Sequence, residues 1–229
     1  MPGAMMELVR LVPGSGPGFT FRRLFVALTN AAAQGDLQAA GRAARSALAI
    51  AEKQGWPHMQ VVIYMAHGAA YLGAKKNAEA LACYRNAGVA GAAAAAQGDP
   101  TGPKLVLQSK LAEGAALVSD EQHAEAAKLY EDAAELAEQQ QDHLMTIESW
   151  RMAAYCHELN KQIEQSWRCV YAALDAAEHL DAAARSSSTL PFVGQGMLRL
   201  VPEQHPEMAD AIRARMHQLV GPEWETTAS

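Results

Sequence analysis

The sequence is poor in aromatic residues and in cysteine. Aromatics make up 6% of its 229 residues, and the three cysteines are Cys83, Cys156 and Cys169. Strands favour ring-bearing side chains, so the shortage of aromatics argues against a β-sandwich. An odd and small number of cysteines also excludes a disulfide framework. Each cysteine lies in an apolar stretch with helical spacing, and we therefore expect buried thiols in a reducing compartment.

The sequence also lacks an excess of positive charge and a long apolar run. Its formal net charge is -6 and its pI is about 5.7, so no strong positive field would hold nucleic acid or an anionic membrane surface. No stretch of roughly eighteen purely apolar residues occurs, which predicts no membrane insertion. The first residues show no basic region followed by an apolar run, the mark of a secretory signal. A cytoplasmic location is the expectation.

What the sequence has in abundance is alanine in a helical pattern. Alanine makes up about a fifth of the chain, a composition typical of helices packed closely through small residues. Apolar residues recur at i, i+3, i+4 and i+7 from near Phe19 to about Leu219, between short segments rich in glycine, proline and other turn residues. That is the period of an α-helix rather than of a strand. The pattern predicts an all-α fold.

The helical segments repeat along the chain. From Gly68, the residues at offsets 3, 12, 16 and 19 are Tyr71, Ala80, Tyr84 and Ala87. The same offsets from Gly114 give Leu117, Ala126, Tyr130 and Ala133, and weaker copies begin at Leu28, Ala154 and Met197. Neighbouring origins lie 40 to 46 residues apart. Antiparallel helices need small residues where their backbones approach, and a large ring fills the gap to the next pair. The repeat therefore predicts tandem helix pairs.

These residues resemble the signature of the tetratricopeptide repeat (TPR) family, a series of small and aromatic positions spread over two helices. The segment 64–88 carries the aromatic, Gly, Tyr, Ala, aromatic, Ala series in full, and the segment 113–136 carries most of it. The resemblance implies a right-handed α-solenoid of TPR-like helix pairs. The repeat is longer than the family's usual period of about 34 residues, so extended helices are expected.

The predicted organisation has three parts. Residues 1–18, with their Pro-Gly-Ser-Gly-Pro-Gly run, are expected to form a flexible N-terminal lead-in. Residues 19–189 are predicted to form the TPR-like solenoid of about four helix pairs. Residues 190–229 are expected to supply C-terminal capping helices and a tail, with the weak fifth copy of the repeat as the cap.

No constellation of catalytic or metal-binding residues stands out in the sequence. No two of the eight histidines have the i,i+4 spacing of a helix-borne metal site, and no Cys-x-x-Cys motif exists. Cys156-His157, Cys169 and His179 come nearest to a metal set, but buried apolar thiols are the expected alternative. The acidic cluster that begins at Glu131 fits a solvated helix face. We therefore predict a protein that is not an enzyme and uses no metal or other cofactor.

Function in helical solenoids concentrates on the concave surface, which the first helix of each pair lines. Helical periodicity turns seven residues of these helices toward that surface, and we expect them to contact a partner: Phe25, Met65, Leu72, Leu111, Arg151, Met152 and Tyr155. The middle of this surface is apolar and its ends are polar. That pattern suits an amphipathic helix or an extended apolar peptide.

The predicted function is binding of another protein, as an adaptor or chaperone. By analogy with compact family members, work for a bacterial secretion or assembly system is expected. Some family members bind acidic C-terminal tails through inner Lys and Asn residues; the matching positions here are Val62, Ala66, Ala69, Gln108 and Ala112, which argues against that activity. Three alternatives stay open: the segment 191–220 fills the groove, the chain self-associates as an oligomeric scaffold, or the groove holds a small ligand.

Overall fold

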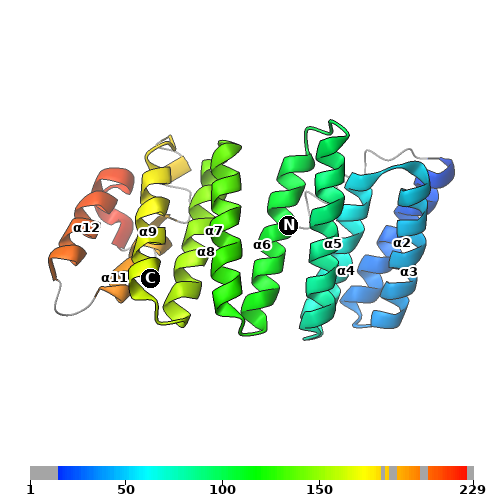
Figure 1. The fold of residues 1–229 in the computed structure, drawn as a ribbon, viewed down its shortest axis with the longest axis horizontal. Coiled ribbons are helices and arrows are strands. Elements are labelled where there is room, and N and C mark those ends of the chain that lie inside the picture. The colour runs from blue at the N-terminus through cyan, green and yellow to red at the C-terminus, as the bar shows by residue number, and fades with distance from the viewer. Residues whose placement is uncertain (1–14, 182–183, 186–189, 202–205, 226–229) are drawn as a thin grey trace. The chain divides into compact units, whose positions relative to one another are not determined.

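The computed structural model of the chain describes residues 15–181, 184–185, 190–201 and 206–225. These residues form α-helices and one short 3₁₀-helix, and the described part contains no strand (Figure 1). The prediction of an all-α fold is confirmed. The helices are α2 (Gly16–Ala33), α3 (Leu37–Gln54), α4 (Pro57–Gly73), α5 (Asn77–Ala96), α6 (Gly102–Ser119), α7 (His123–Gln139), α8 (His143–Leu159), α9 (Ile163–Ala177), α11 (Leu190–Leu200), α12 (Pro206–Val220) and η1 (Pro222–Glu225).

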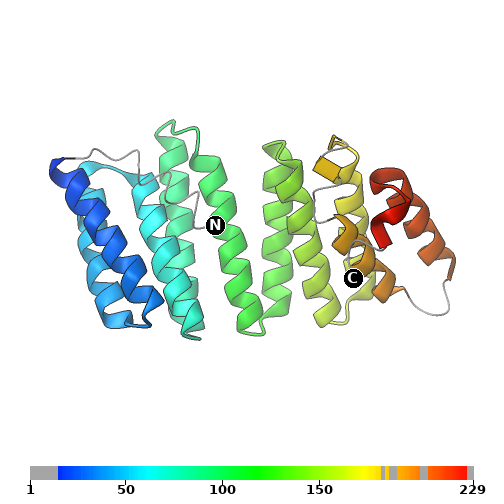
Figure 2. The same ribbon diagram turned by 180° about the vertical axis from the view of Figure 1, so that it is seen from behind.

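The chain divides into two compact units, residues 1–121 and residues 122–229. Unit 1 contains α2 to α6, and unit 2 contains α7 to η1. The division falls inside the third predicted helix pair, whose first helix is α6 and whose second helix is α7. In unit 1, α2 and α4 lie on one face, toward the viewer in Figure 2, while α3 and α5 lie on the other.

The helices match the predicted repeat in order and length. α2 and α3, α4 and α5, and α8 and α9 are successive neighbours that pack together, and α11 and α12 form the weaker fifth pair. The helices from α2 to α9 are 15 to 20 residues long. α2 begins at Gly16 rather than near Phe19, because Pro17 suits a first-turn position, where its missing N–H costs nothing. The remainder of the predicted lead-in, residues 1–14, lies outside the described residues.

The turns between helices share one geometry. In seven of them a residue with positive φ follows the helix: Gly35, Gly55, Lys75, Gly98, Glu121, Gln141 and Lys161. In six of these turns the next residue donates its backbone N–H to a carbonyl five residues earlier, as Asp36 does to Ala31 at 2.9 Å and Lys76 does to Tyr71 at 2.9 Å. This is the Schellman arrangement, which satisfies carbonyls left free at a helix end. It sends the chain back antiparallel after each helix.

Small residues let the helices of unit 1 approach closely. A Cβ on Gly68 of α4 would lie 2.7 Å from Cε1 of Tyr84 on α5, so the ring occupies the space beside the glycine. A Cβ on Gly91 would lie 3.1 Å from the backbone nitrogen of Val106 on α6. On α3 and α5 the buried positions are mostly alanine. The core of unit 1 thus combines close backbone approach at small residues with large buried side chains of α2 and α4, such as Phe21 and Met59.

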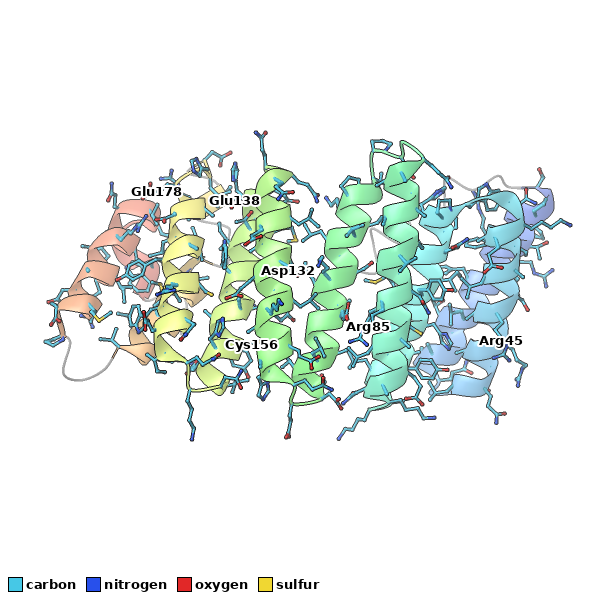
Figure 3. The ribbon with its side chains drawn as sticks, in the orientation of Figure 1. Arg45, Arg85, Asp132, Glu138, Cys156 and Glu178 are labelled. Carbon is cyan, nitrogen blue, oxygen red and sulfur yellow. The ribbon has the colours of Figure 1, made fainter. Side chains whose placement is uncertain are left out.

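Ion pairs lie at the surface and join neighbouring helices. Nε of Arg85, labelled on α5 in Figure 3, donates to Oε1 of Glu113 on α6 at 2.7 Å. In unit 2, Arg215 of α12 donates to Asp175 and, at 2.7 Å, to Glu178. That contact ties the last helix to the end of α9. Trp224 of η1 is buried and would meet a Cβ on Gly194 of α11, so η1 seals this end of the unit.

Candidate functional site

Unit 1 contains a pocket of about 700 Å³ on its α2 and α4 face, which we call the α2–α4 pocket. Its floor contains Phe25 and Met65, both almost fully buried, and the ring of Tyr84 reaches it from α5. The walls are mostly small residues of α2, α4, α6, the α2–α3 turn and the start of α3: Thr29, Ala32, Ala33, Gly35, Leu37, Ala66, Ala69, Ala70, Gly73, Ala74 and Ala112. The pocket exists because alanine and glycine leave the space that larger side chains would fill.

The α2–α4 pocket is almost entirely apolar. Among the residues that the structure describes, no charged side chain lines it. The Thr29 hydroxyl donates to the carbonyl of Val26 at 3.1 Å, so its hydrogen is already used within the helix. Burial is the main cause that raises the pKa of Tyr84 to about 12, so this side chain stays neutral at ordinary pH. Such a surface can shelter apolar groups, but it offers neither a nucleophile nor an acid–base pair for catalysis.

His67 lies behind the pocket, between α3, α4 and α5. Its ring packs on Tyr71 with centroids 4.4 Å apart, and Nδ1 lies 3.8 Å from Sγ of Cys83. Its Nε2 is buried without a hydrogen-bond partner and faces Gly41 and Arg45 of α3. Burial, followed by the charge of Arg45, lowers the pKa of His67. The folded protein therefore favours the neutral ring, and His67 is a packed residue rather than a base facing a substrate.

The lowered pKa of His67 predicts a loss of stability in mild acid. The unfolded ring titrates near its ordinary pKa of about 6.5, and the folded ring below it. Stabilisation by the neutral ring is thus present above about pH 6.5 and lost as pH falls toward the folded pKa. We expect a lower urea midpoint, followed by circular dichroism, at pH 5.5 than at pH 7.5. The His67→Gln variant should show a smaller decrease between the same two pH values. An equal decrease in both proteins would contradict the role of His67.

Unit 2 contains a smaller and more polar pocket of about 380 Å³ between α8 and α11, which we call the α8–α11 pocket. Arg151 and Glu158 of α8 and Arg199 of α11 lie around it. The guanidinium of Arg151 donates to Oε2 of Glu148 at 2.9 Å, and this hydrogen bond is the main reason that the pKa of Arg151 is raised. α11 packs against α8 and α9. The C-terminal segment thus forms one wall of this pocket.

Unit 2 also holds a polar cluster that joins three successive helices. Nε2 of His157 on α8 lies 2.8 Å from Oε1 of Glu131 on α7, and the thiol of Cys169 on α9 donates to the same oxygen at 3.7 Å. Oε1 of Gln162 lies 2.9 Å from the other nitrogen of His157. The sequence places Glu131 on a solvated face and does not pair it with either residue. Glu131 precedes His157 by 26 residues and Cys169 by 38 residues, so only the packing of the helices brings the three side chains together.

Comparison with solved structures identifies the architecture. The chain is similar to a putative kinesin light chain of Podosopora anserina with nearly identical TPR-like repeats, at a TM-score of 0.59 and 17% identity; the match covers 91% of this chain and 96% of that one. The fold is TPR-like. No family of known sequences matches the chain, nor does any curated protein. Within the described residues, no helix is long and apolar enough to cross a membrane.

The TPR-like helix pairs place the seven predicted partner-binding residues in different surroundings. Phe25 and Met65 line the α2–α4 pocket, and Arg151 and Tyr155 line the α8–α11 pocket. Leu72, Leu111 and Met152 are half-buried and line neither pocket. The seven predicted residues do not include the alanines around Phe25 and Met65, although Ala69 and Ala112 were expected to face inward. Their signal was present in the sequence as small residues on the inner face of first helices.

Proposed function

We propose that this protein is a non-catalytic interaction module that binds an amphipathic helix of a partner protein in the α2–α4 pocket. The observation that carries the proposal is an uncharged, alanine-walled pocket of about 700 Å³ on the α2 and α4 face of a TPR-like unit. Helix-in-groove recognition places apolar side chains at i, i+3 or i+4 into such a surface. The absence of charge in the lining favours leucine, isoleucine, methionine or phenylalanine as the inserted side chains.

The location of the pocket supports a partner helix more than a flat protein surface. The space lies between first helices and reaches a floor formed by Phe25 and Met65, so a side chain that projects from a helix can enter it. Its length along α4, from Met65 to Ala74, is that of two to three helical turns. Adaptor or chaperone work in a cytoplasm, for a bacterial secretion or assembly system, is the finer form of this proposal. Three buried free thiols agree with a reducing compartment.

A charge placed in the α2–α4 pocket should weaken binding. Ala69 is exposed at the pocket wall, and glutamate is a good helix former, so Ala69→Glu should fold normally. We would select binders from a displayed library of amphipathic helical peptides and measure their affinity by fluorescence anisotropy. We expect Ala69→Glu to lower the affinity about tenfold or more, because the partner's apolar side chain would face a charge.

Ala27→Glu is the matched control. Ala27 is exposed on α2 and does not line the α2–α4 pocket, so this variant carries the same charge at a position that a bound helix need not touch. It should bind the selected peptides like the unchanged protein. Equal affinity of both variants would show that the peptides bind elsewhere and would overturn the proposed site.

The volume of the pocket favours a small apolar ligand as the second candidate function, since small-molecule sites span about 300–1,000 Å³. Native mass spectrometry of the purified protein separates the two. A bound metabolite that Ala69→Glu releases, together with no helical binder in the selection, would establish the second candidate. Sedimentation velocity at several concentrations tests the remaining alternative of self-association, which predicts a concentration-dependent mass.

A further inference from the structure

The cluster of Glu131, His157 and Cys169 in unit 2 has the donor atoms of a transition-metal site. α7, α8 and α9 follow one another in this unit (Figure 1), and each contributes one side chain. One nitrogen, one carboxylate oxygen and one sulfur lie within 4.8 Å of one another. His157 is 7% exposed and Cys169 is 2% exposed, while the Glu131 side chain is half-buried. Two ligands are thus held inside the helix packing, and the third faces the solvent from which an ion would enter.

The hydrogen bonds around His157 leave a place for a cation. An amide oxygen only accepts hydrogen bonds, so the contact of 2.9 Å between Oε1 of Gln162 and Nδ1 of His157 puts a hydrogen on Nδ1. In that tautomer the lone pair is on Nε2, which points at Oε1 of Glu131 at 2.8 Å. Two lone pairs at this distance repel each other unless a proton or a metal ion lies between them. In metal sites, the histidine nitrogen that does not bind the metal usually donates a hydrogen bond to an oxygen, as Nδ1 does here.

Cys169 adds a third donor, from α9. Its side chain is 2% exposed, and its thiol donates to Oε1 of Glu131 at 3.7 Å. A divalent cation at this point replaces that proton, which passes to the solvent, and it compensates the two negative charges of thiolate and carboxylate.

The separations between the donor atoms fit tetrahedral zinc. With the usual zinc bond lengths, a carboxylate oxygen and a sulfur lie about 3.6 Å apart, and an imidazole nitrogen and an oxygen about 3.3 Å. The observed values are 3.7 Å for Glu131 and Cys169 and 2.8 Å for Glu131 and His157. Of these two, the second must lengthen by about half an ångström, which a rotation of the half-exposed Glu131 side chain provides. The nitrogen of His157 and the sulfur of Cys169 lie within 4.8 Å of each other, compared with about 3.6 Å around a tetrahedral zinc ion. A nitrogen, oxygen and sulfur set selects zinc over magnesium or calcium, which prefer oxygen alone.

We propose that Glu131, His157 and Cys169 bind one zinc ion, with Gln162 orienting His157 and with water in the fourth position. The ion would tie α7, α8 and α9 together, because each helix supplies one ligand. It would stabilise unit 2 by mass action, since the unfolded chain does not hold the three donors in place. The site is independent of the α2–α4 pocket, which lies in unit 1.

The test uses the full chain stripped of metal by a chelator, with Zn²⁺ and Co²⁺ as probes. We expect one equivalent of Zn²⁺ to bind in a calorimetric titration and to raise the melting temperature. One equivalent of Co²⁺ should bind as well and give the near-ultraviolet absorption of a cobalt–thiolate bond. Cys169→Ala should abolish that absorption, and Glu131→Gln should lower the Zn²⁺ affinity at least about tenfold.

Cys156→Ala is the matched control, because Cys156 is buried one position before His157 and is not among the three ligands. It should keep the cobalt absorption and the Zn²⁺ stoichiometry. The proposal is overturned if the unchanged protein takes up no stoichiometric Zn²⁺. It is equally overturned if uptake persists in both Cys169→Ala and Glu131→Gln, since the ion would then be held by other histidines. Circular dichroism of each variant shows whether a loss of binding comes from unfolding.

Discussion

Gly102→Ala should destabilise unit 1 by about 3 kcal/mol, the upper part of the range for overpacking a close contact. A Cβ on Gly102, at the start of α6, would lie 2.3 Å from the backbone nitrogen and 2.5 Å from the Cα of Ala95 on α5. Backbone atoms cannot rotate away, so the last turn of α5 or the first turn of α6 has to move. Urea unfolding should show the loss, and hydrogen exchange should show reduced protection in α5 and α6.

Gly73→Ala is the control for Gly102→Ala. Gly73 ends α4, and a Cβ there would meet no atom within 4 Å. Alanine should therefore stabilise the helix by about 0.5–1 kcal/mol, because glycine loses more backbone entropy on folding. Opposite signs for the two substitutions would confirm that Gly102 is required for close approach. Equal effects of the two variants would show that α5 and α6 pack less closely than the structure indicates.

The helical segments and their order were predictable because each carries its own periodic signal. The apolar spacing and the repeat around Gly68 depend on residues within one helix pair. The structure places Gly68 of α4 against the ring of Tyr84 on α5, within that pair, whereas the ring was expected to fill the gap to the next pair. Gly102 could not be interpreted in the same way. Its neighbours Asp99 and Pro103 predict that Gly102 lies in a turn. Its contact with Ala95 depends on how sharply the chain reverses between α5 and α6, which the sequence does not show.

The candidate sites were predictable only in part, because they depend on contacts between helices. Helical periodicity predicts that Phe25 and Met65 face inward from first helices. It does not predict that the neighbouring side chains are too small to fill the space beside them. The alanines of α2 and α4 leave that space. The cluster of Glu131, His157 and Cys169 has no local spacing at all, since its members come from three helices. The turns give a third example: Lys75, Gln141 and Lys161 adopt positive φ without the glycine that usually signals it.

Tyr130→Ala should destabilise unit 2 by about 3–5 kcal/mol, the cost of removing a large buried aromatic side chain and leaving a cavity. Tyr130 is 2% exposed on α7, and burial is the main cause that raises its pKa. The charges of Glu148 and Arg151 on α8 also influence that pKa, so the ring lies at the contact between α7 and α8.

Tyr155→Ala on α8 is the comparison. Tyr155 is 44% exposed, so its removal should lower the free energy of unfolding by less than about 1 kcal/mol. Urea unfolding of both variants, followed by circular dichroism, measures the difference. Similar losses for the two tyrosines would contradict the interpretation of the repeat, because the aromatic residue sixteen positions after Gly114 would then not be the ring that fills the gap between helices.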